Sequence, residues 1–201
     1  MYRYYLKRMF DFLLAISVLP FFLIILLVIG PIIYFQDKGN IFYNAPRLGL
    51  NGKVFKMYKF RSMKIDAPDL RNEDGSTFNA EDDPRLTKIG KVIRKYSLDE
   101  TPQIINVIKG DMSFIGPRPD LPGAIYDYRD DDKKKLDVRP GITGYSQAYY
   151  RNSLEQRKKF QKDVYYVNNL TFLFDIKILL KTITSVISRK NIYSQNLIIK
   201  K

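Results

Sequence analysis

One uninterrupted apolar stretch near the start of the chain limits what this sequence can fold into. Residues 12–36 read FLLAISVLPFFLIILLVIGPIIYFQ and contain no charged side chain. As a straight helix they would reach roughly 37 Å at about 1.5 Å per residue, whereas a bilayer core is about 30 Å thick. A buried core helix does not carry so long an uncharged run, so we expect the segment to enter a membrane.

The way in which the segment enters depends on its prolines and on the charges that flank it. Pro20 removes a backbone donor in the middle of the run and should break the helix there. Basic residues lie on both sides, with Arg3, Lys7 and Arg8 before the run and Lys38, Arg47, Lys53 and Lys56 after it. Because basic flanks favour the cytoplasmic side, a re-entrant helix-break-helix satisfies both ends. A simple span satisfies one end and stays open as the alternative.

A second membrane signal lies near the other end of the chain. Residues 173–188 read LFDIKILLKTITSVIS, and a helix would place four apolar side chains on one face, Ile176, Leu180, Ile183 and Ile187. Lys177 and Lys181 would lie beside them, as in a basic amphipathic helix at a membrane surface or on a protein core. We expect residues 1–36 to form the membrane anchor and residues 37–201 a cytoplasmic domain that includes interfacial helices.

The composition excludes several kinds of chemistry. The chain has 34 Lys and Arg against 21 Asp and Glu, a net charge of +13, so its partners should be anionic. It contains neither Cys nor His, which excludes disulfides, thiolate or His-ligated zinc sites and nucleophiles activated by His. Any catalysis would have to use carboxylates, Lys, Arg, Tyr, hydroxyls or a hard metal ion.

The remaining chain predicts a helix-rich α+β fold. IFYNAP and KVFKMYKFRSM flank RLGLNG, whose Asn51-Gly52 pair indicates a β-hairpin, and the second strand would deliver Lys59 and Arg61. We expect helices at about 86–95, 102–108, 122–137 and 153–167. Ser153 and Gln156 would form the capping box of the last helix, and YRDDDKKK a solvated face. We expect loops at 66–83 and 110–123, and loop or short strand at 139–152.

The segment YSLDETPQ, at 96–103, places Asp99 and Glu100 directly before a helix start. Thr101 suits the N-cap and Pro102 the first turn. The positive end of that helix would favour a carboxylate or a phosphate beside it. Two adjacent carboxylates also need a counter-charge, which Mg²⁺ or arginine can supply. The pair could hold Mg²⁺, act as a base or attack phosphorus, and spacing alone does not choose among these roles.

Arginines next to helix ends or Gly/Pro-rich loops are candidates for phosphate binding, namely Arg94, Arg118, Arg139 and Arg151. In such places the guanidinium group is held as a fixed fork, which suits phosphate oxygens. For any single one of them, a solvated surface charge is the alternative.

Four longer motifs together carry a resemblance to a known family. They are KR(x)₂D at 7–11, RLGLNGKVFKMYKFRSM at 47–63, DPRLTKIGKVIRKYSLDETPQIINVIKGDMSFIGPRP at 83–119 and RPGITGYSQ at 139–147. Their order and spacing resemble the bacterial sugar transferase family, the small monotopic phosphoglycosyl transferases, over nearly the whole chain. Ala45, Thr101 and Tyr145 depart from the family's usual Gln, Leu and Trp, and the first and last of these changes could alter the choice of sugar.

The resemblance implies a reaction and a set of site residues. Members move a sugar 1-phosphate from a nucleotide diphosphate sugar to a polyprenol phosphate, release UMP and use Mg²⁺. By this resemblance Asp99 is the nucleophile that forms a covalent phosphosugar intermediate, and Glu100 assists the metal or proton transfer. The substrate phosphates would meet Arg94 and Arg118, and further contacts would come from Lys59, Arg61 and Arg151.

The resemblance also implies partners and a location. We expect a UDP-linked N-acetylated amino sugar as donor and undecaprenyl phosphate as acceptor, at the cytoplasmic face of the bacterial inner membrane. The family's N-terminal segment is a re-entrant helix broken at a proline, which matches Pro20. We expect no nucleic-acid partner, because the basic residues are dispersed along the chain.

Two other functions agree with parts of the sequence. A membrane-tethered basic protein that binds anionic lipid or nucleic acid without catalysis would account for the charge. A one-step Mg²⁺-dependent transferase would use Asp99 only as a ligand or a base.

Overall fold

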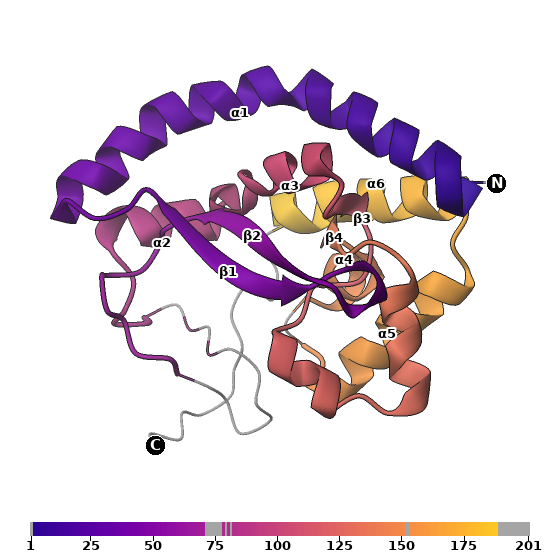
Figure 1. The fold of residues 1–201 in the computed structure, drawn as a ribbon. Coiled ribbons are helices and arrows are strands. Elements are labelled where there is room, and N and C mark those ends of the chain that lie inside the picture. Colours follow the sequence, from indigo (N-terminus) through magenta and orange to yellow (C-terminus); the bar gives the residue numbers. More distant parts are fainter. Residues whose placement is uncertain (1, 71–77, 79, 81, 152, 189–201) are drawn as a thin grey trace.

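The chain folds beneath one long curved helix. A computed structural model describes residues 2–70, 78, 80, 82–151 and 153–188. Helix α1 (Lys7–Asp37) follows a short π-helical turn and arches over the other elements, with α3 and α6 beneath it (Figure 1). The remaining helices are shorter and the strands form two small pairs. The expected helix-rich α+β fold with a small hairpin is confirmed.

The remaining helices and strands follow in chain order: β1 (Phe42–Leu48), β2 (Val54–Phe60), α2 (Lys88–Lys95), α3 (Gln103–Lys109), β3 (Ser113–Ile115), β4 (Gly141–Thr143), α4 (Tyr145–Tyr150), α5 (Gln156–Asn168) and α6 (Phe172–Ser188). Tighter 3₁₀ turns lie at Leu50–Gly52, Leu98–Glu100, Pro122–Tyr126 and Asp130–Asp137. The helices expected near 86–95, 102–108 and 173–188 are therefore present as α2, α3 and α6.

Helix α1 continues through both of its prolines. We expected a break at Pro20, but the helix includes Pro20 and Pro31 without interruption and is curved (Figure 1). Each proline removes only one backbone donor, and the hydrogen bonds of the neighbouring turns keep the chain helical on both sides of it. Within the part of the chain that the structure describes, α1 is the one helix long and apolar enough to cross a membrane, and 17% of its most apolar 18-residue stretch is buried.

The buried side of α1 forms the main core with the elements beneath it. Ala15, Phe22 and Ile33 of α1 pack with Met57 and Phe60 of β2, Ile93 of α2, Val107 of α3, and Met112, which lies between α3 and β3. The hairpin of β1 and β2 is antiparallel and pairs Phe42 with Phe60 at its open end. At its tip Asn51 and Gly52 take left-handed φ angles of 55° and 74°, as the sequence predicts for this pair.

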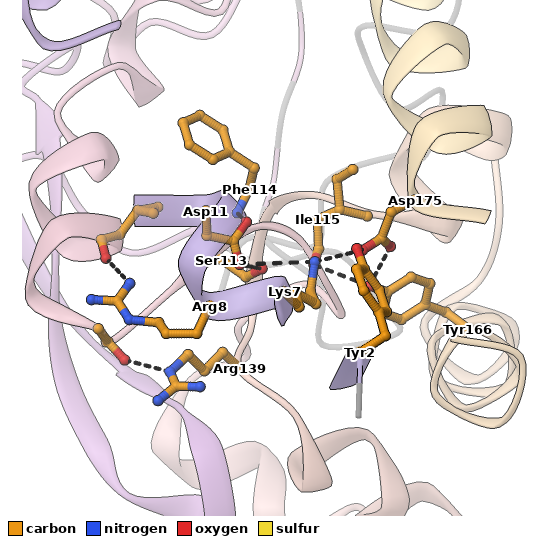
Figure 2. A network of polar contacts seen from close by, with 12 residues as sticks. Tyr2, Lys7, Arg8, Asp11, Ser113, Phe114, Ile115, Arg139, Tyr166 and Asp175 are labelled. Atoms are coloured by element: carbon orange, nitrogen blue, oxygen red, sulfur yellow. Dashed lines mark hydrogen bonds and ion pairs between the residues drawn. The ribbon is translucent and has the colours of Figure 1, made fainter. Parts of the chain in front are cut away.

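A buried polar network fixes the start of α1 to the rest of the chain (Figure 2). The Lys7 ammonium lies 2.7 Å from Asp175 Oδ2 at the start of α6, and Tyr166 of α5 donates to the other oxygen of Asp175 at 2.7 Å. One turn along α1, Asp11 accepts hydrogen bonds from the Ser113 hydroxyl at 2.5 Å and from the Phe114 amide at 3.0 Å. Charged groups are tolerated in such a place only when they are paired, so these contacts explain Lys7 and Asp11 of the KR(x)₂D motif.

The arginine of the same motif closes the end of α3. Arg8 donates to the carbonyl oxygens of Val107 and Ile108 in the last turn of α3, where a helix lacks its regular backbone donors. The Val107 oxygen also accepts from the Gly110 amide at 3.1 Å. Arg139 donates from Nε to the Gly110 carbonyl oxygen at 2.8 Å, and Gly110 takes the left-handed φ of 93° that commonly ends a helix. Arg139 therefore has a structural contact at the C-terminal end of α3, whereas Asp99 and Glu100 precede its N-terminal end.

Two segments expected to be irregular or helical have a different structure. Strand β3 lies inside the expected loop at 110–123 and pairs in parallel with β4, Ser113 with Gly141 and Ile115 with Thr143. A Cβ on Gly141 would lie 2.1 Å from the Gly116 nitrogen, so the two backbones approach closely only because glycine stands there. The α-helix expected at 122–137 is instead two separate 3₁₀ helices, Pro122–Tyr126 and Asp130–Asp137.

The charged run YRDDDKKK is not simply a solvated face, as we expected. Asp132 and Lys135 are buried, and the Lys135 ammonium lies 2.5 Å from Asp120 Oδ2 and 2.8 Å from Asp163 Oδ2. Asp132 is paired with Arg157 of α5. Partners distant in sequence thus take two of these charges into the protein, while Asp130 and Asp131 stay exposed.

Both predicted hydroxyl caps are wrong. Thr101 does not cap α3, because its hydroxyl donates to the Leu98 carbonyl oxygen at 2.8 Å. Ser153 does not cap α5, because its hydroxyl donates to the Tyr150 carbonyl oxygen at 2.7 Å, and α5 begins without a side-chain cap. In each case the hydroxyl finds an acceptor in the preceding turn, a local bond that competes with capping.

Helix α6 has one buried and one exposed side. Asp175 and Ile178 are buried, and Phe172 contacts the rings of Tyr2 and Phe10 at 5.8 and 5.4 Å. The exposed apolar side chains of α6 include Leu173, Ile176, Leu180, Ile183 and Val186. The Ile187 side chain, also part of the expected stripe, lies outside the described part, as do residues 71–77, 79 and 81 of the expected loop.

Candidate active site

Asp99 and Glu100 lie in a 3₁₀ turn between α2 and α3. Ser97 opens the turn with a left-handed φ of 56°, a conformation that costs free energy for a residue with a side chain. Its amide donates to the Arg94 carbonyl oxygen at 3.1 Å, and the Thr101 amide donates to the Leu98 carbonyl oxygen at 3.2 Å. This tight path brings the two carboxylates back towards the end of α2.

Strand β2 contributes a lysine to the same place. The Lys59 ammonium donates to Glu100 Oε1 at 2.6 Å, and both side chains are largely buried. The fully buried Asn106 of α3 sets the position of the strand, because its amide donates to the Lys56 carbonyl oxygen at 2.8 Å and accepts from the Tyr58 amide at 2.9 Å. Asn106 thereby ties the strand that carries Lys59 to the helix that follows the carboxylates.

Two arginines complete the surroundings of the pair. Arg118, in the segment after β3, places Nη1 4.0 Å from Glu100 Oε1, and its side chain is 51% exposed. Arg94, in the last turn of α2, acts through its charge on both Asp99 and Glu100. The structure therefore brings together five of the residues that the sequence suggested, Lys59, Arg94, Asp99, Glu100 and Arg118.

Burial dominates the acidity of Asp99. Its residue is only 8% exposed, and removal from water raises the pKa of Asp99 to about 6, against the lowering effect of the nearby Lys59 charge. The negative charge of Glu100 raises the pKa of Asp99 further. The carboxylate is still mostly ionised at neutral pH, and its charge is poorly hydrated, which suits a nucleophile.

The pKa of Glu100 is shifted in the opposite direction from that of Asp99. Burial alone would raise its pKa, but the charges of Lys59 and Arg118 and the hydrogen bond from Lys59 outweigh burial and lower the pKa of Glu100. The two neighbouring carboxylates thus have pKa values that are pushed apart, a pattern typical of catalytic pairs.

Two other predicted arginines lie at the ends of structural elements. Arg61 is buried and ties the end of α1 to the end of β2, since it donates to both oxygens of Asp37 at 2.6 and 2.5 Å and to the Asn40 carbonyl oxygen at 2.6 Å. Arg151 ends α4, a helix that packs on α5 and α6, and burial lowers the pKa of its guanidinium group. The structure thus gives Arg61 a structural contact with Asp37, and it places Arg151 at the end of α4.

Asp99 and Glu100 are the residues that could hold a divalent metal ion. Mg²⁺ binds oxygen ligands and is commonly held by one or two carboxylates together with substrate phosphates. Among the described residues no group of three or more Asp, Glu, His or Cys side chains gathers into a metal site. The donor set of this pair fits Mg²⁺ that shares its coordination with a diphosphate.

Sequence reasoning missed Asn106 and Asp83. Asn106 could have been noticed as a polar residue inside the otherwise apolar run IINVI. Asp83 lies in a segment that we expected to be solvated, yet it is fully buried next to Arg85 and Arg94. Only the position of Asp83 immediately before the proline and arginine of the DPR motif set it apart from the acidic residues that precede it.

Comparison with known proteins identifies a family and several relatives. The family model described as bacterial sugar transferase matches residues 2–189. An uncharacterized sugar transferase, EpsL, of Bacillus subtilis is 40% identical over 191 residues, which cover 95% of this chain and 92% of that protein.

Two further relatives are longer proteins. The undecaprenyl-phosphate galactose phosphotransferase of Salmonella typhimurium is 37% identical over 94% of this chain and 42% of its own length. The UDP-N-acetylgalactosamine-undecaprenyl-phosphate N-acetylgalactosaminephosphotransferase of Aeromonas hydrophila is 35% identical over 92% of this chain and 44% of its own length. The chain thus spans less than half of each. With a family model that covers almost its whole length, this chain belongs to the bacterial sugar transferase family.

Proposed function

We propose that this protein transfers a sugar 1-phosphate from a UDP-sugar to undecaprenyl phosphate and releases UMP, as the first membrane step in the synthesis of a glycoconjugate. The observation that carries the proposal is the buried Asp99–Glu100 pair surrounded by Lys59, Arg94 and Arg118. The names of two relatives mention the same lipid acceptor. For the donor we favour a UDP-linked N-acetylated amino sugar.

Asp99 is the proposed nucleophile. In the first step one of its oxygens attacks the phosphorus atom that carries the sugar, the bond from that phosphorus to the bridging oxygen breaks, and UMP leaves. In the second step an oxygen of undecaprenyl phosphate attacks the same phosphorus, the bond to Asp99 breaks, and the product is a lipid diphosphate sugar. The pKa of about 6 supports this role, because the carboxylate is already ionised at neutral pH and needs no general base to remove its proton.

The cationic side chains support the charge that phosphoryl transfer develops. Lys59 holds Glu100, while Arg94 and Arg118 face the pair with positive charge that phosphate oxygens can share. Mg²⁺ held by Asp99 and Glu100 would neutralise part of the diphosphate charge.

A labelling experiment tests the covalent step. The protein would be incubated with Mg²⁺ and a donor labelled with ³²P at the sugar-bearing phosphate, without the lipid acceptor. The donors would include UDP-N-acetylgalactosamine, UDP-N-acetylglucosamine, UDP-galactose and UDP-glucose. We expect label on Asp99, none in Asp99→Asn, and normal labelling in Asp131→Asn, which removes an exposed carboxylate. Turnover with undecaprenyl phosphate but no labelled protein would favour the one-step mechanism instead.

We further propose that α1 is a re-entrant anchor in the inner membrane and that the exposed apolar side of α6 meets the same membrane surface. Both ends of α1 are bound to the same folded body, through Lys7 and Asp11 at the start and through Asp37 at the end. Because both ends return to that body, they belong on its side of the membrane, the cytoplasmic side.

The absence of native cysteines makes the topology easy to test. Tyr5 and Lys38 are exposed near the two ends of α1, and single cysteines at these positions would be the sole thiols of the chain. In intact cells we expect both Tyr5→Cys and Lys38→Cys to resist a membrane-impermeant thiol reagent and to react after the membrane is opened. Reaction of either cysteine in intact cells would establish a simple span.

A further inference from the structure

Asp83 is a buried carboxylate whose hydrogen bonds are supplied by Arg85. The residue is 0% exposed and accepts from the Arg85 amide at 3.0 Å, from Nε at 2.9 Å and from Nη2 at 2.7 Å. The charge and hydrogen bonds of Arg85 outweigh burial and keep the pKa of Asp83 below its usual value. Arg85 also donates to the carbonyl oxygens of Pro68 and Phe78 at 3.0 and 3.1 Å, so each of its side-chain nitrogens is occupied.

Arg94 is the second cation beside Asp83, and it is bound differently. Its Nη1 lies 3.9 Å from Asp83 Oδ2, within the range of an ion pair but beyond that of a hydrogen bond. That nitrogen is buried and has no hydrogen-bond partner among the described residues. A buried donor left open costs free energy and points to a missing partner. Because the charge of Arg94 also acts on Asp99 and Glu100, the open donor belongs to the candidate active site.

The local backbone fixes the distance between Asp83 and Arg94. The Thr87 side chain caps α2 by accepting from the Gly90 amide at 2.9 Å, and the Thr87 amide donates to the Ser62 carbonyl oxygen at 3.1 Å. A Cβ on Gly90 would lie 1.8 Å from the same Ser62 oxygen, so α2 lies directly against that strand end. Asp83 precedes α2 and Arg94 lies in its last turn. The packing that holds this helix in place therefore also sets the distance between the two side chains.

We propose that Asp83 is a positioning residue that holds the Arg94 guanidinium group in place for the diphosphate of the nucleotide sugar. The charge of Asp83 attracts Arg94, while Arg85 supplies the hydrogen bonds to the Asp83 oxygens. Arg94 is therefore held in place without a hydrogen bond of its own to Asp83. The Nη1 donor therefore stays open to a phosphate oxygen, to which guanidinium groups bind well. This inference rests on the proposed function, because it assumes that a nucleoside diphosphate group binds beside Asp99.

A double-mutant cycle on the full-length protein tests the proposal. Binding of UDP, in the presence of MgCl₂, would be measured by titration calorimetry on the purified protein in lipid nanodiscs. The variants are Asp83→Asn, Arg94→Gln and the two together. The matched control is Asp82→Asn, which removes the neighbouring but exposed carboxylate. Thermal unfolding of each variant shows that it is folded.

We expect Asp83→Asn to weaken UDP binding about tenfold, and to have no further effect once Arg94 is replaced, because contacting residues are coupled. Asp82→Asn should bind like the wild type. Unchanged affinity in Asp83→Asn, or an equal loss with and without Arg94, would overturn the positioning role. If Asp83→Asn does not fold, Asp83→Glu takes its place, since it keeps the charge that Arg85 requires and displaces the carboxylate by one methylene group.

The same samples separate this inference from the function on which it rests. Turnover of the donor panel with undecaprenyl phosphate would be measured on the wild type. If the wild type is active and the effects of the two substitutions are additive, the positioning role of Asp83 is refuted and the proposed function stands. A wild type that turns over no donor refutes the proposed function, and one that binds no UDP refutes both.

Discussion

Asp99 keeps a negative charge where water scarcely reaches it. Its raised pKa means that the folded protein holds the ionised carboxylate less readily than the unfolded chain does. A residue prepared to attack phosphorus thus carries a cost in stability, which the positive charge of Lys59 only partly offsets. Such an opposition between stability and activity is common where a site must keep a reactive group poorly solvated.

Asp99→Asn should therefore stabilise the fold at neutral pH in buffer with EDTA. The folded-state pKa of about 6 lies above the usual 3.8, so the wild type loses stability as pH rises from about 4 through 6. The gain in the variant is at most about 3 kcal/mol, at about 1.36 kcal/mol per pKa unit. Thermal unfolding of both proteins between about pH 5 and 8 should show a difference that grows with pH. A difference that is constant over this range would contradict the assignment of the raised pKa to Asp99.

At the scale of helices and strands, the local signals predicted where elements lie, but those for a break at Pro20 and for caps at Thr101 and Ser153 were wrong. Asn51-Gly52 predicts the hairpin because both residues take positive φ within a single turn, and Pro102, which suits a first turn, indicates the start of α3. The pairing of β3 with β4 was missed, because Ser113 and Gly141 lie far apart in sequence. The burial of Lys135 was missed for the same reason, since its partners Asp120 and Asp163 come from other segments.

The sequence also predicted only part of the candidate site. Asp99 and Glu100 could be found because they are adjacent and stand in a specific motif. Arg61 shares its motif with Lys59, but it lies two residues further along and pairs with Asp37 instead. The role of Asn106 depends on the backbone of β2, which no local pattern in the sequence specifies.

Gly90→Ala tests how firmly α2 must be seated. The added Cβ would meet the Ser62 carbonyl oxygen at 1.8 Å, so α2 must move away from that strand end and take Arg94 with it. We expect a loss of about 2 kcal/mol or more in the free energy of unfolding and a clear loss of transferase activity. Lys91→Ala, on the exposed side of the same helix, should change neither quantity appreciably. Denaturant unfolding and turnover on both variants would measure this, and a fully active, stable Gly90→Ala would show that the close contact is dispensable.

On the scale of the whole molecule, α1 is part of the catalytic body as well as the proposed anchor. Its inner side shares a core with β2, α2 and α3, and its first turns bind β3, α3 and α6. The segments that carry Asp99 and Arg118 adjoin α3 and β3 respectively. The placement of the site therefore depends on contacts made by a helix whose remaining surface is mostly apolar and exposed.

Asp11→Ala should separate folding from membrane attachment. The change leaves the Phe114 amide and the Ser113 hydroxyl without their acceptor and should cost about 3 kcal/mol in the free energy of unfolding. Flotation with vesicles of bacterial lipids should be unchanged, because the apolar surface of α1 is intact. Asp130→Ala, an exposed change, serves as the control. Loss of flotation together with normal unfolding would show that Asp11 acts at the membrane rather than in the fold.

The ties at both ends of α1 have a practical consequence for anyone who wishes to prepare this enzyme without detergent. Deleting the first 37 residues would take Asp37 from Arg61, Lys7 from Asp175 and Arg8 from the last carbonyl groups of α3, and would expose the core side of β2 to water. The shortened polypeptide should aggregate rather than remain an active soluble monomer. Replacing the outward-facing leucines, isoleucines and phenylalanines of α1 with polar residues, while keeping Lys7, Arg8, Asp11 and Asp37, is the better route to a water-soluble form.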